Sequence, residues 1–219
     1  MIGDTAAIHH WCHAGGHREI PPQRRPLLLS PAVARLSGKN GADVLMEKPI
    51  LVTWATRSGS TAEVAESIIA TLREGGLAVE GRPVRDVQTL EGYGAVVLGI
   101  PLYMTRLHRD GRRFLTAFRR DLTAHPVSLF VLGPVHDKEE EFVTARRQLS
   151  KQLGKFPWFA PVTQEVFGGR WDPERLGFPF SLLPAMKNMP AMDARNWTAI
   201  HAWAEALRDQ LQAKQPAHI

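Results

Sequence analysis

Short apolar runs that alternate with helical patterns constrain the fold of this chain more than any other feature. Two of them, Ala95–Gly99 (AVVLG) and Val127–Gly133 (VSLFVLG), are apolar at every position except Ser128, which is typical of strands buried on both faces. Five strands are predicted in all, at 50–53, 77–84, 95–99, 127–133 and 161–167. Strands that alternate with helices indicate an α/β fold, here a doubly wound five-stranded parallel sheet with helices on both faces.

Four helices are expected between and after these strands, at 61–73, 106–123, 138–153 and 194–212. The first ends at Gly75 and Gly76, since glycine commonly ends a helix. The last is amphipathic and places four residues on one side, as a helix packed on a core does. These residues are Trp197, Ile200, Ala204 and Leu207.

A doubly wound sheet binds its ligands at the carboxyl ends of the strands, where the strand order reverses. This rule brings three loops together around one predicted site: 54–61, 100–108 and 133–138.

The first 46 residues differ from the rest of the chain. They mix histidines, Cys12 and glycines with a Pro21–Pro22 pair, without sustained periodicity, and we expect residues 1–46 to be disordered or weakly ordered. Their histidine and cysteine spacing matches no standard zinc site, so no metal site is predicted. The binding domain is expected to span 47–213, followed by a tail at 214–219.

Composition narrows the function classes. A single cysteine excludes an internal disulfide framework, and the longest apolar runs are too short to cross a bilayer. No secretory signal is recognisable, so we expect a cytoplasmic protein, with peripheral contact at the inner face of the membrane left open. The net charge of +5 comes without a long basic run or a nucleic-acid motif, which disfavours nucleic-acid binding.

The loop TRSGST, residues 56–61, is rich in hydroxyl groups. It opens a helix, whose unpaired N–H groups and partial positive charge suit a phosphate. Gly59 allows a close backbone approach or a positive φ, and Arg57 either adds a charged contact or points to solvent. The hydroxyls belong to Thr56, Ser58, Ser60 and Thr61.

One serine or threonine would be enough to cap this helix, so four hydroxyls in six residues favour phosphate binding over capping alone. The loop has neither the lysine motif of a P-loop nor the Gly-x-Gly-x-x-Gly of a dinucleotide site. A hydroxyl-rich loop without lysine suits a monophosphate.

This loop resembles the Thr-x-Thr-Gly-x-Thr phosphate loop of the flavodoxin-like superfamily, with serine in the third place. The resemblance covers residues 48 to about 212 and looks closest to the branch that contains menaquinone-dependent protoporphyrinogen oxidase. Two further stretches carry the closer match. They are YGAVVLGIPLYMTRLH (93–108), and FGGRWDPERLGFPF (167–180) with DARNW (193–197).

The resemblance implies FMN as the cofactor. Its phosphate would be held by the first loop, which comprises Thr56, Arg57, Ser58, Gly59, Ser60 and Thr61. The isoalloxazine ring would be bordered by Pro101, Leu102, Tyr103, Met104 and Thr105, and by Gly133, Pro134, Val135 and His136. Tyr103 either stacks on the ring or packs against the edge of the sheet.

The chain also departs from the oxidase. It has MPAMDARNW before the last helix instead of a Gly-Gly-Glu-Thr-Asp-Thr-like stretch, and GPVHDKEEE (133–141) instead of a polar, basic loop. We expect an FMN-dependent oxidoreductase, with a quinone and a porphyrinogen as its candidate partners. The alternatives are an electron-transfer flavodoxin without its own substrate site, and a flavin-free interaction module. No catalytic residue is predicted, because in flavin enzymes the cofactor performs the electron chemistry.

Arginines crowd the region after the third strand, where Asp110 is the only carboxylate between 106 and 120. Cations near the ring would stabilise reduced, anionic flavin and raise its potential, and would attract a carboxylate-bearing or quinone-like substrate. Alternatively, most of these arginines line a solvated helix face. They are Arg106, Arg109, Arg112, Arg113, Arg119 and Arg120.

The segment FPFSLLPAMKNM (178–189) is apolar. It either covers the flavin, forms a quinone entrance or touches a membrane surface, or it is a short helix that completes the core.

Overall fold

The computed structural model describes residues 48–103, 105–175 and 190–213, all within one compact unit. Its central sheet is parallel, in the order β2-β1-β3-β5-β6, which confirms the predicted doubly wound, five-stranded core. The strands are β1 (Ile50–Trp54), β2 (Val79–Pro83), β3 (Ala95–Tyr103), β5 (Val127–Leu132) and β6 (Thr163–Phe167). A short sixth strand, β4 (Arg106–Leu107), pairs antiparallel with β3.

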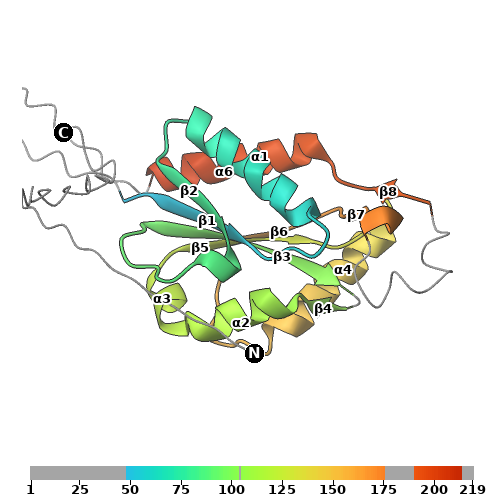
Figure 1. Cartoon of the computed structure of the whole chain (residues 1–219), viewed down its shortest axis with the longest axis horizontal. Helices are drawn as coiled ribbons and strands as arrows, with labels where there is room; N and C mark the ends of the chain where they lie inside the picture. The colour runs from blue at the N-terminus through green and yellow to red at the C-terminus, as the bar shows by residue number, and fades with distance from the viewer. Residues whose placement is uncertain (1–47, 104, 176–189, 214–219) are drawn as a thin grey trace, which may run out of the picture. The chain divides into compact units, whose positions relative to one another are not determined.

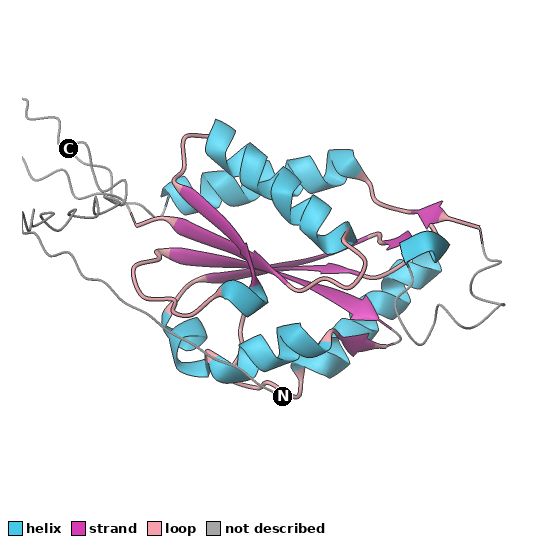
Figure 2. Cartoon of the chain, in the orientation of Figure 1, coloured by secondary structure: helices cyan, strands magenta, loops and turns pink. Residues whose placement is uncertain are grey.

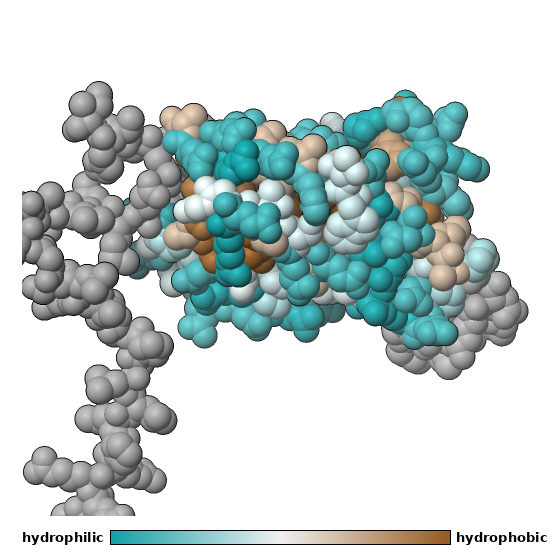
Figure 3. Space-filling model, turned by 90° about the horizontal axis from the view of Figure 1, so that it is seen from above, coloured by the Kyte–Doolittle hydropathy of each residue, from teal (hydrophilic) through white to brown (hydrophobic). Residues whose placement is uncertain are grey.

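Helices cover both faces of the sheet (Figure 1; Figure 2). One face carries α1 (Ser60–Glu74) and α6 (Trp197–Ala213), and the other carries α2 (Arg109–Ala117), α3 (Arg119–Ala124) and α4 (Glu139–Leu153). Seen from the side of α1 and α6, the surface is mostly hydrophilic, with apolar residues in small areas (Figure 3). The apolar sides of these two helices are therefore turned inward.

Alternation along each strand divides the core into two layers. On β5, Phe130 packs in the layer under α1 and α6, whereas Leu129 and Val131 pack in the layer over α2, α3 and α4. The side chains that β3 and β5 contribute to the two layers are almost all buried. This explains why the sequences of these two strands are almost entirely apolar. The Phe130 ring fills the space beside Gly99, where an added Cβ would lie 2.2 Å from the ring.

The expected helix at 106–123 is wrong in its limits and its continuity. The chain first turns back at Thr105, which has a φ of 68°, and forms β4; α2 and α3 then follow, with a break at Phe118. The buried residues Phe114 and Leu122 suit one helix or two consecutive helices equally, so their spacing did not reveal the break. The bounds of the other predicted elements differ from the observed ones by at most four residues, and the largest difference is at the end of β3, which continues to Tyr103.

One predicted core residue is also wrong. Trp197, the first residue of α6, is 39% exposed. The other three residues of the predicted stripe, Ile200, Ala204 and Leu207, are buried.

The parallel strands run in one direction, so their carboxyl ends share one edge of the sheet. From β1 the chain crosses to β2 on one side and returns to β3 on the other, which places the reversal of strand order between β1 and β3. Beyond this edge lie the 3₁₀ turn η2 (Pro173–Arg175) and a separate antiparallel pair, β7 (Arg170–Trp171) and β8 (Met192–Asp193). A second 3₁₀ turn, η1 (Val84–Asp86), follows β2.

Candidate functional site

A cavity of about 80 Å³ lies at the carboxyl edge of the sheet. It is lined by all three loops that the sequence places there, together with the segment after β6. Ligand pockets usually measure ~300–1,000 Å³, so this cavity has the size of a single small group such as a phosphate. Its walls are Arg57, Ser58, Ser60, Thr61, Pro101, Leu102, Tyr103, Leu132, Gly133, Val135, Gly169, Arg170, Trp171 and Asp172.

The loop before α1 leaves the start of that helix without a side-chain cap. Gly59 is the N-cap residue, with a φ of 93° that L side chains rarely adopt, and no side chain accepts a hydrogen bond there. Thr56 turns inward instead, and its Oγ1 accepts the N–H of Gly59 at 3.0 Å. The alternative that a hydroxyl group of this loop caps the helix is therefore not observed in this structure.

Two buried polar atoms at the cavity have no hydrogen-bond partner among the residues that the structure describes. Thr61 is 1% exposed and lines the cavity, yet its Oγ1 has no hydrogen-bond partner in the described part of the chain. The same holds for the indole Nε1 of Trp171 on β7. Buried polar groups are almost always paired, so these two atoms indicate that the cavity takes a polar ligand.

The side chain of Arg57 contacts another residue and does not simply point to solvent. Its guanidinium lies over the ring of Tyr103, 5.1 Å from the centroid, which joins the first loop to the end of β3. Both residues also line the cavity. A cationic group and an aromatic face thus meet beside the phosphate-sized space.

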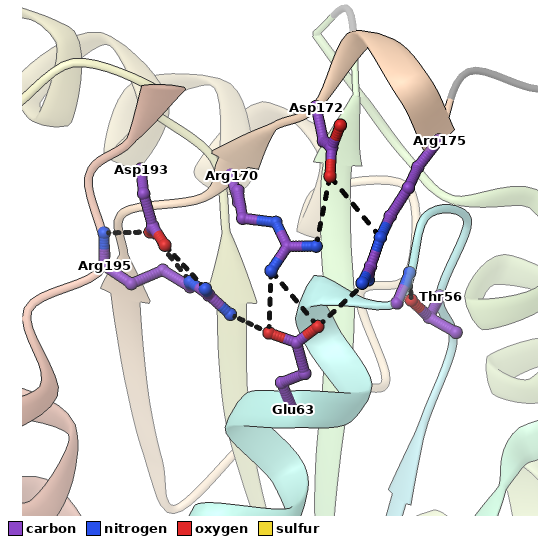
Figure 4. A network of polar contacts seen from close by, with 8 residues as sticks. Thr56, Glu63, Arg170, Asp172, Arg175, Asp193 and Arg195 are labelled. Carbon is purple, nitrogen blue, oxygen red and sulfur yellow. Dashed lines mark hydrogen bonds and ion pairs between the residues drawn. The ribbon is translucent and has the colours of Figure 1, made fainter. Parts of the chain in front are cut away.

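An ion-pair network adjoins the cavity through Arg170 and Asp172, which line it (Figure 4). At its centre is Glu63, in the first turn of α1, which is bound by arginines from β7, η2 and the loop before α6. The three shortest contacts are Arg195 at 2.6 Å, Arg170 at 3.1 Å and Arg175 at 3.1 Å. Two further carboxylates, Asp172 and Asp193, bind the same arginines.

The network shifts the acidity of its members. The hydrogen bond from Arg195 is the main cause of the lowered pKa of Glu63, and it also lowers the pKa of Asp193. The same contact with Asp193 raises the pKa of Arg195. Glu63, Asp193 and Arg195 are therefore all charged at neutral pH.

Sequence reasoning missed this network. Apart from Glu63, its members lie in the stretches GRWDPER (169–175) and DAR (193–195), whose resemblance to a family gave no indication of this role. Because Glu63 is 107 residues before Arg170 and 132 before Arg195, no local spacing pattern relates them. The only feature of the sequence that could have indicated the network is the number of arginines and aspartates between β6 and α6.

The start of α2 lies next to this site. His108 is its N-cap residue, and its Nδ1 accepts the N–H of Asp110 at 3.3 Å. Burial is the main cause of the lowered pKa of His108, with Arg57 among the nearby cations that add to it. Its imidazole is therefore held neutral among positive charges.

A second, larger hollow of about 450 Å³ shares two walls, Leu102 and Gly133, with the cavity. It lies against α4 and is lined by predicted site residues Thr105 and Pro134, with Glu140 and Glu141 opposite. The hollow is polar and negatively charged on its α4 side.

The remaining predicted site residues lie as follows. His136 is exposed, and its Nδ1 contacts Glu141 at 2.8 Å, away from the cavity. Thr56 and Gly59 shape the first loop without lining the cavity. Met104, the segment 178–189 and the histidine-rich start lie outside the described residues. In the part of the chain that the structure describes, no helix is long and apolar enough to span a membrane.

Comparisons with known proteins agree with this geometry. The flavodoxin domain family matches residues 51–180. Rubredoxin oxygen:oxidoreductase from the anaerobe Desulfovibrio gigas has a similar structure, with a TM-score of 0.50 and 15% identity. The match covers 78% of this chain and 38% of that one, so this chain spans well under half the length of that protein.

Two flavodoxins are also similar. One from the domain Archaea gives a TM-score of 0.45 at 11% identity and covers 75% of this chain and 99% of its own. A mutant flavodoxin from Pseudomonas aeruginosa gives 0.47 at 15% identity, with the same coverage of 75% and 99%. No curated protein matches the sequence.

Proposed function

The chain belongs to the flavodoxin domain family, whose cofactor is FMN, and we propose that it is an FMN-dependent oxidoreductase that passes electrons to a quinone. The phosphate-sized cavity at the start of α1 is the observation that carries this proposal. Unpaired N–H groups at a helix N-terminus suit a phosphate, and the buried Oγ1 of Thr61 there has no partner in the described chain.

The chain's own residues fit the phosphate end of FMN. Ser58, Ser60 and Thr61 line the cavity and would donate to the phosphate, while Gly59 keeps the loop open at its positive φ. Thr56 would act indirectly, since its hydroxyl oxygen holds the Gly59 N–H.

The ring end of FMN would lie toward the ends of β3 and β5. Pro101, Leu102, Tyr103, Gly133 and Val135 line that side of the cavity, and the larger hollow continues beyond Leu102 and Gly133. When bound, FMN supplies the redox chemistry. The loops would exclude water from one side of the ring and orient its edge toward the hollow.

Charge supports an oxidoreductase with a raised potential. Arg57 lies at the cavity, and Arg106 and Arg109 are exposed on the adjoining β4 and the start of α2. Positive charge near the ring favours the reduced form by Coulomb attraction, which raises the reduction potential. An exposed arginine face beside the cofactor also suits an acceptor or donor that carries carboxylates, as a porphyrinogen does.

The test begins with purified protein titrated with FMN and followed by flavin absorbance and fluorescence. Saturable binding is expected; colourless protein that never takes up FMN would contradict every flavin-based function and leave the interaction module. The FMN midpoint potential is then measured, and a value as strongly negative as that of a low-potential carrier would contradict the proposal. Turnover with menaquinone analogues separates an enzyme from a carrier flavodoxin, which would be reduced without turning over.

A further inference from the structure

The ion-pair network around Glu63 places Arg170 on the wall of the phosphate-sized cavity and Arg175 next to Gly59, in the loop that borders it. We infer that Arg170 and Arg175 form a charged wall of this cavity and make it selective for a terminal phosphate monoester dianion. The inference rests on the proposed function, because it concerns the same site. It goes beyond that function by assigning ligand selectivity to residues outside the hydroxyl loop.

The positions of the two guanidinium groups carry the inference. Arg170 lines the cavity, and its side chain is 19% exposed. Nη1 of Arg175 lies only 3.3 Å from the point where a Cβ on Gly59 would stand, directly over the uncapped start of α1 (Figure 4). Both arginines therefore reach the place where the helix N-terminus offers its N–H groups.

Glu63 makes this positive charge necessary. Its carboxylate is in the first turn of α1, and the lowered pKa keeps it ionised, so an incoming phosphate would meet a negative charge. A phosphate monoester carries a charge of about −1.5 to −2 at neutral pH, because its second pKa is about 6. Arginines between Glu63 and the cavity remove this repulsion and offer a planar fork of donors to phosphate oxygens.

The three arginines of the network are not equivalent. Arg195 is 4% exposed and is bound to both Glu63 and Asp193, so it is a fixed structural member. Arg175 is 50% exposed and has contacts of 3.1 and 3.4 Å with Glu63 and Asp172. It is the member that can turn toward a ligand at the lowest energetic cost.

A separate observation indicates that a ligand belongs here. The Oγ1 of Thr61 is buried without a partner in the described chain and lies on the same cavity as Arg170. A phosphate oxygen would satisfy that hydroxyl and a guanidinium together. Riboflavin has no phosphate and should lose these contacts, whereas each phosphate of FAD is bridged to the other by an anhydride and lacks the second charge, so its contacts should be weaker.

The experiment compares FMN and riboflavin affinities, measured by fluorescence quenching, for the wild-type protein and for Arg175→Gln. A charge-assisted hydrogen bond contributes about 1.5–3 kcal/mol, so we expect the FMN dissociation constant to rise about 10- to 100-fold. The riboflavin constant should stay within about twofold, since riboflavin makes no phosphate contact. Arg170→Gln should act in the same direction.

Three controls make the result decisive. Arg82→Gln removes a half-buried arginine that is paired with Glu80 on β2 and does not line the cavity, and it should change neither constant. Arg175→Lys keeps the charge without the fork and should fall between wild type and Arg175→Gln. Inorganic phosphate should compete with FMN in the wild-type protein and much less in Arg175→Gln.

Equal weakening of both flavins in Arg175→Gln, or no weakening of either, would overturn the inference while leaving FMN binding intact. Failure of the wild-type protein to bind either flavin would instead overturn the proposed function. If Arg175→Gln does not fold, the lysine variant and phosphate competition in the wild-type protein decide the question: unchanged FMN affinity together with absent competition would overturn it.

Discussion

The Oε2 atom of Glu63 lies 2.6 Å from Nη1 of Arg195, which is 132 positions later in the chain. This contact ties the first turn of α1 to the loop that leads into α6. Arg195 also lies over the ring of Trp197, 4.7 Å from its centroid. The loop at the start of the first helix is thus positioned by residues from near the end of the chain.

Acid should weaken this connection. The folded state lowers the pKa of Glu63 below its ordinary value of 4.5, so its contribution to stability is complete above that value and is lost as pH falls through the lowered one. Asp193 acts in the same direction. Chemical denaturation between neutral and acid pH should show the free energy of unfolding falling less steeply in Glu63→Gln than in wild type.

Glu66→Gln is the matched control, because Glu66 is exposed on the same helix. It should retain the wild-type pH dependence. An identical acid profile for wild type and Glu63→Gln would show that the network contributes nothing to stability.

Replacement of Thr61 by valine should distinguish the contribution of its hydroxyl group to FMN binding from its contribution to the stability of the apo protein. Its buried hydroxyl has no partner in the described chain, so Thr61→Val should leave the apo protein as stable as before or more stable by roughly 1 kcal/mol. FMN should bind more weakly by about 3- to 10-fold, since a neutral hydrogen bond contributes roughly 0.5–1.5 kcal/mol. Thermal unfolding and flavin titration measure the two effects.

Thr53 offers the control for this change. It is buried on β1, and its Oγ1 is likewise without a partner among the described residues, but it does not line the cavity. Thr53→Val should affect apo stability as Thr61→Val does and leave FMN affinity unchanged. Equal loss of FMN affinity in both variants would mean that Thr61 does not contact the cofactor.

Gly59→Ala should damage both the fold and the site. The left-handed backbone costs an L residue about 1–2 kcal/mol, and the new methyl would also press on Arg175. Gly76 has a φ of 84° with open space around it, at the other end of α1. Gly76→Ala should lose similar stability, measured by denaturation, but only Gly59→Ala should weaken FMN binding.

His108 predicts a second pH effect. Burial lowers its pKa below the ordinary 6.5, so the folded protein should lose stability as pH falls from that value through the lowered one. Protonation would also remove the Nδ1 lone pair that accepts the Asp110 N–H. Histidine titration by NMR should give a value below 6.5 for this residue.

His108→Asn keeps a good N-cap but cannot titrate. It should therefore begin α2 normally and lack this part of the pH dependence. If the variant and the wild type lose stability identically over the same pH range, His108 is not the group responsible.

The sheet and its binding edge could be predicted because their causes are local. Val127–Leu132 is buried at every position and apolar at all but Ser128 because layers cover both sides of β5, and the hydroxyl loop at 56–61 follows β1 directly. Parallel strands then force the loops after β1, β3 and β5 to one edge, and the cavity lies there.

The features that could not be predicted depend on contacts between residues that are far apart in the sequence. Arg170 and Arg195 form ion pairs with Glu63 only when folding brings β7 and the loop before α6 close to it. Likewise, β4 exists because Thr105 reverses the chain against β3, a tertiary pairing that an arginine-rich helical pattern concealed. The exposure of Trp197 follows from where α6 begins, which periodicity does not define.

The position of α6 has a consequence for how the protein is made. Its buried residues Ile200, Ala204 and Leu207 share one apolar cluster with Ile68 and Leu72 of α1. During synthesis the part of this sheet face that α6 covers stays exposed until α6 has left the ribosome, and exposed apolar surface of this kind promotes aggregation. The similarity to the family ends at residue 180, so a fragment cut there would keep the loop before α1 and lack the helix that seals the core beside it.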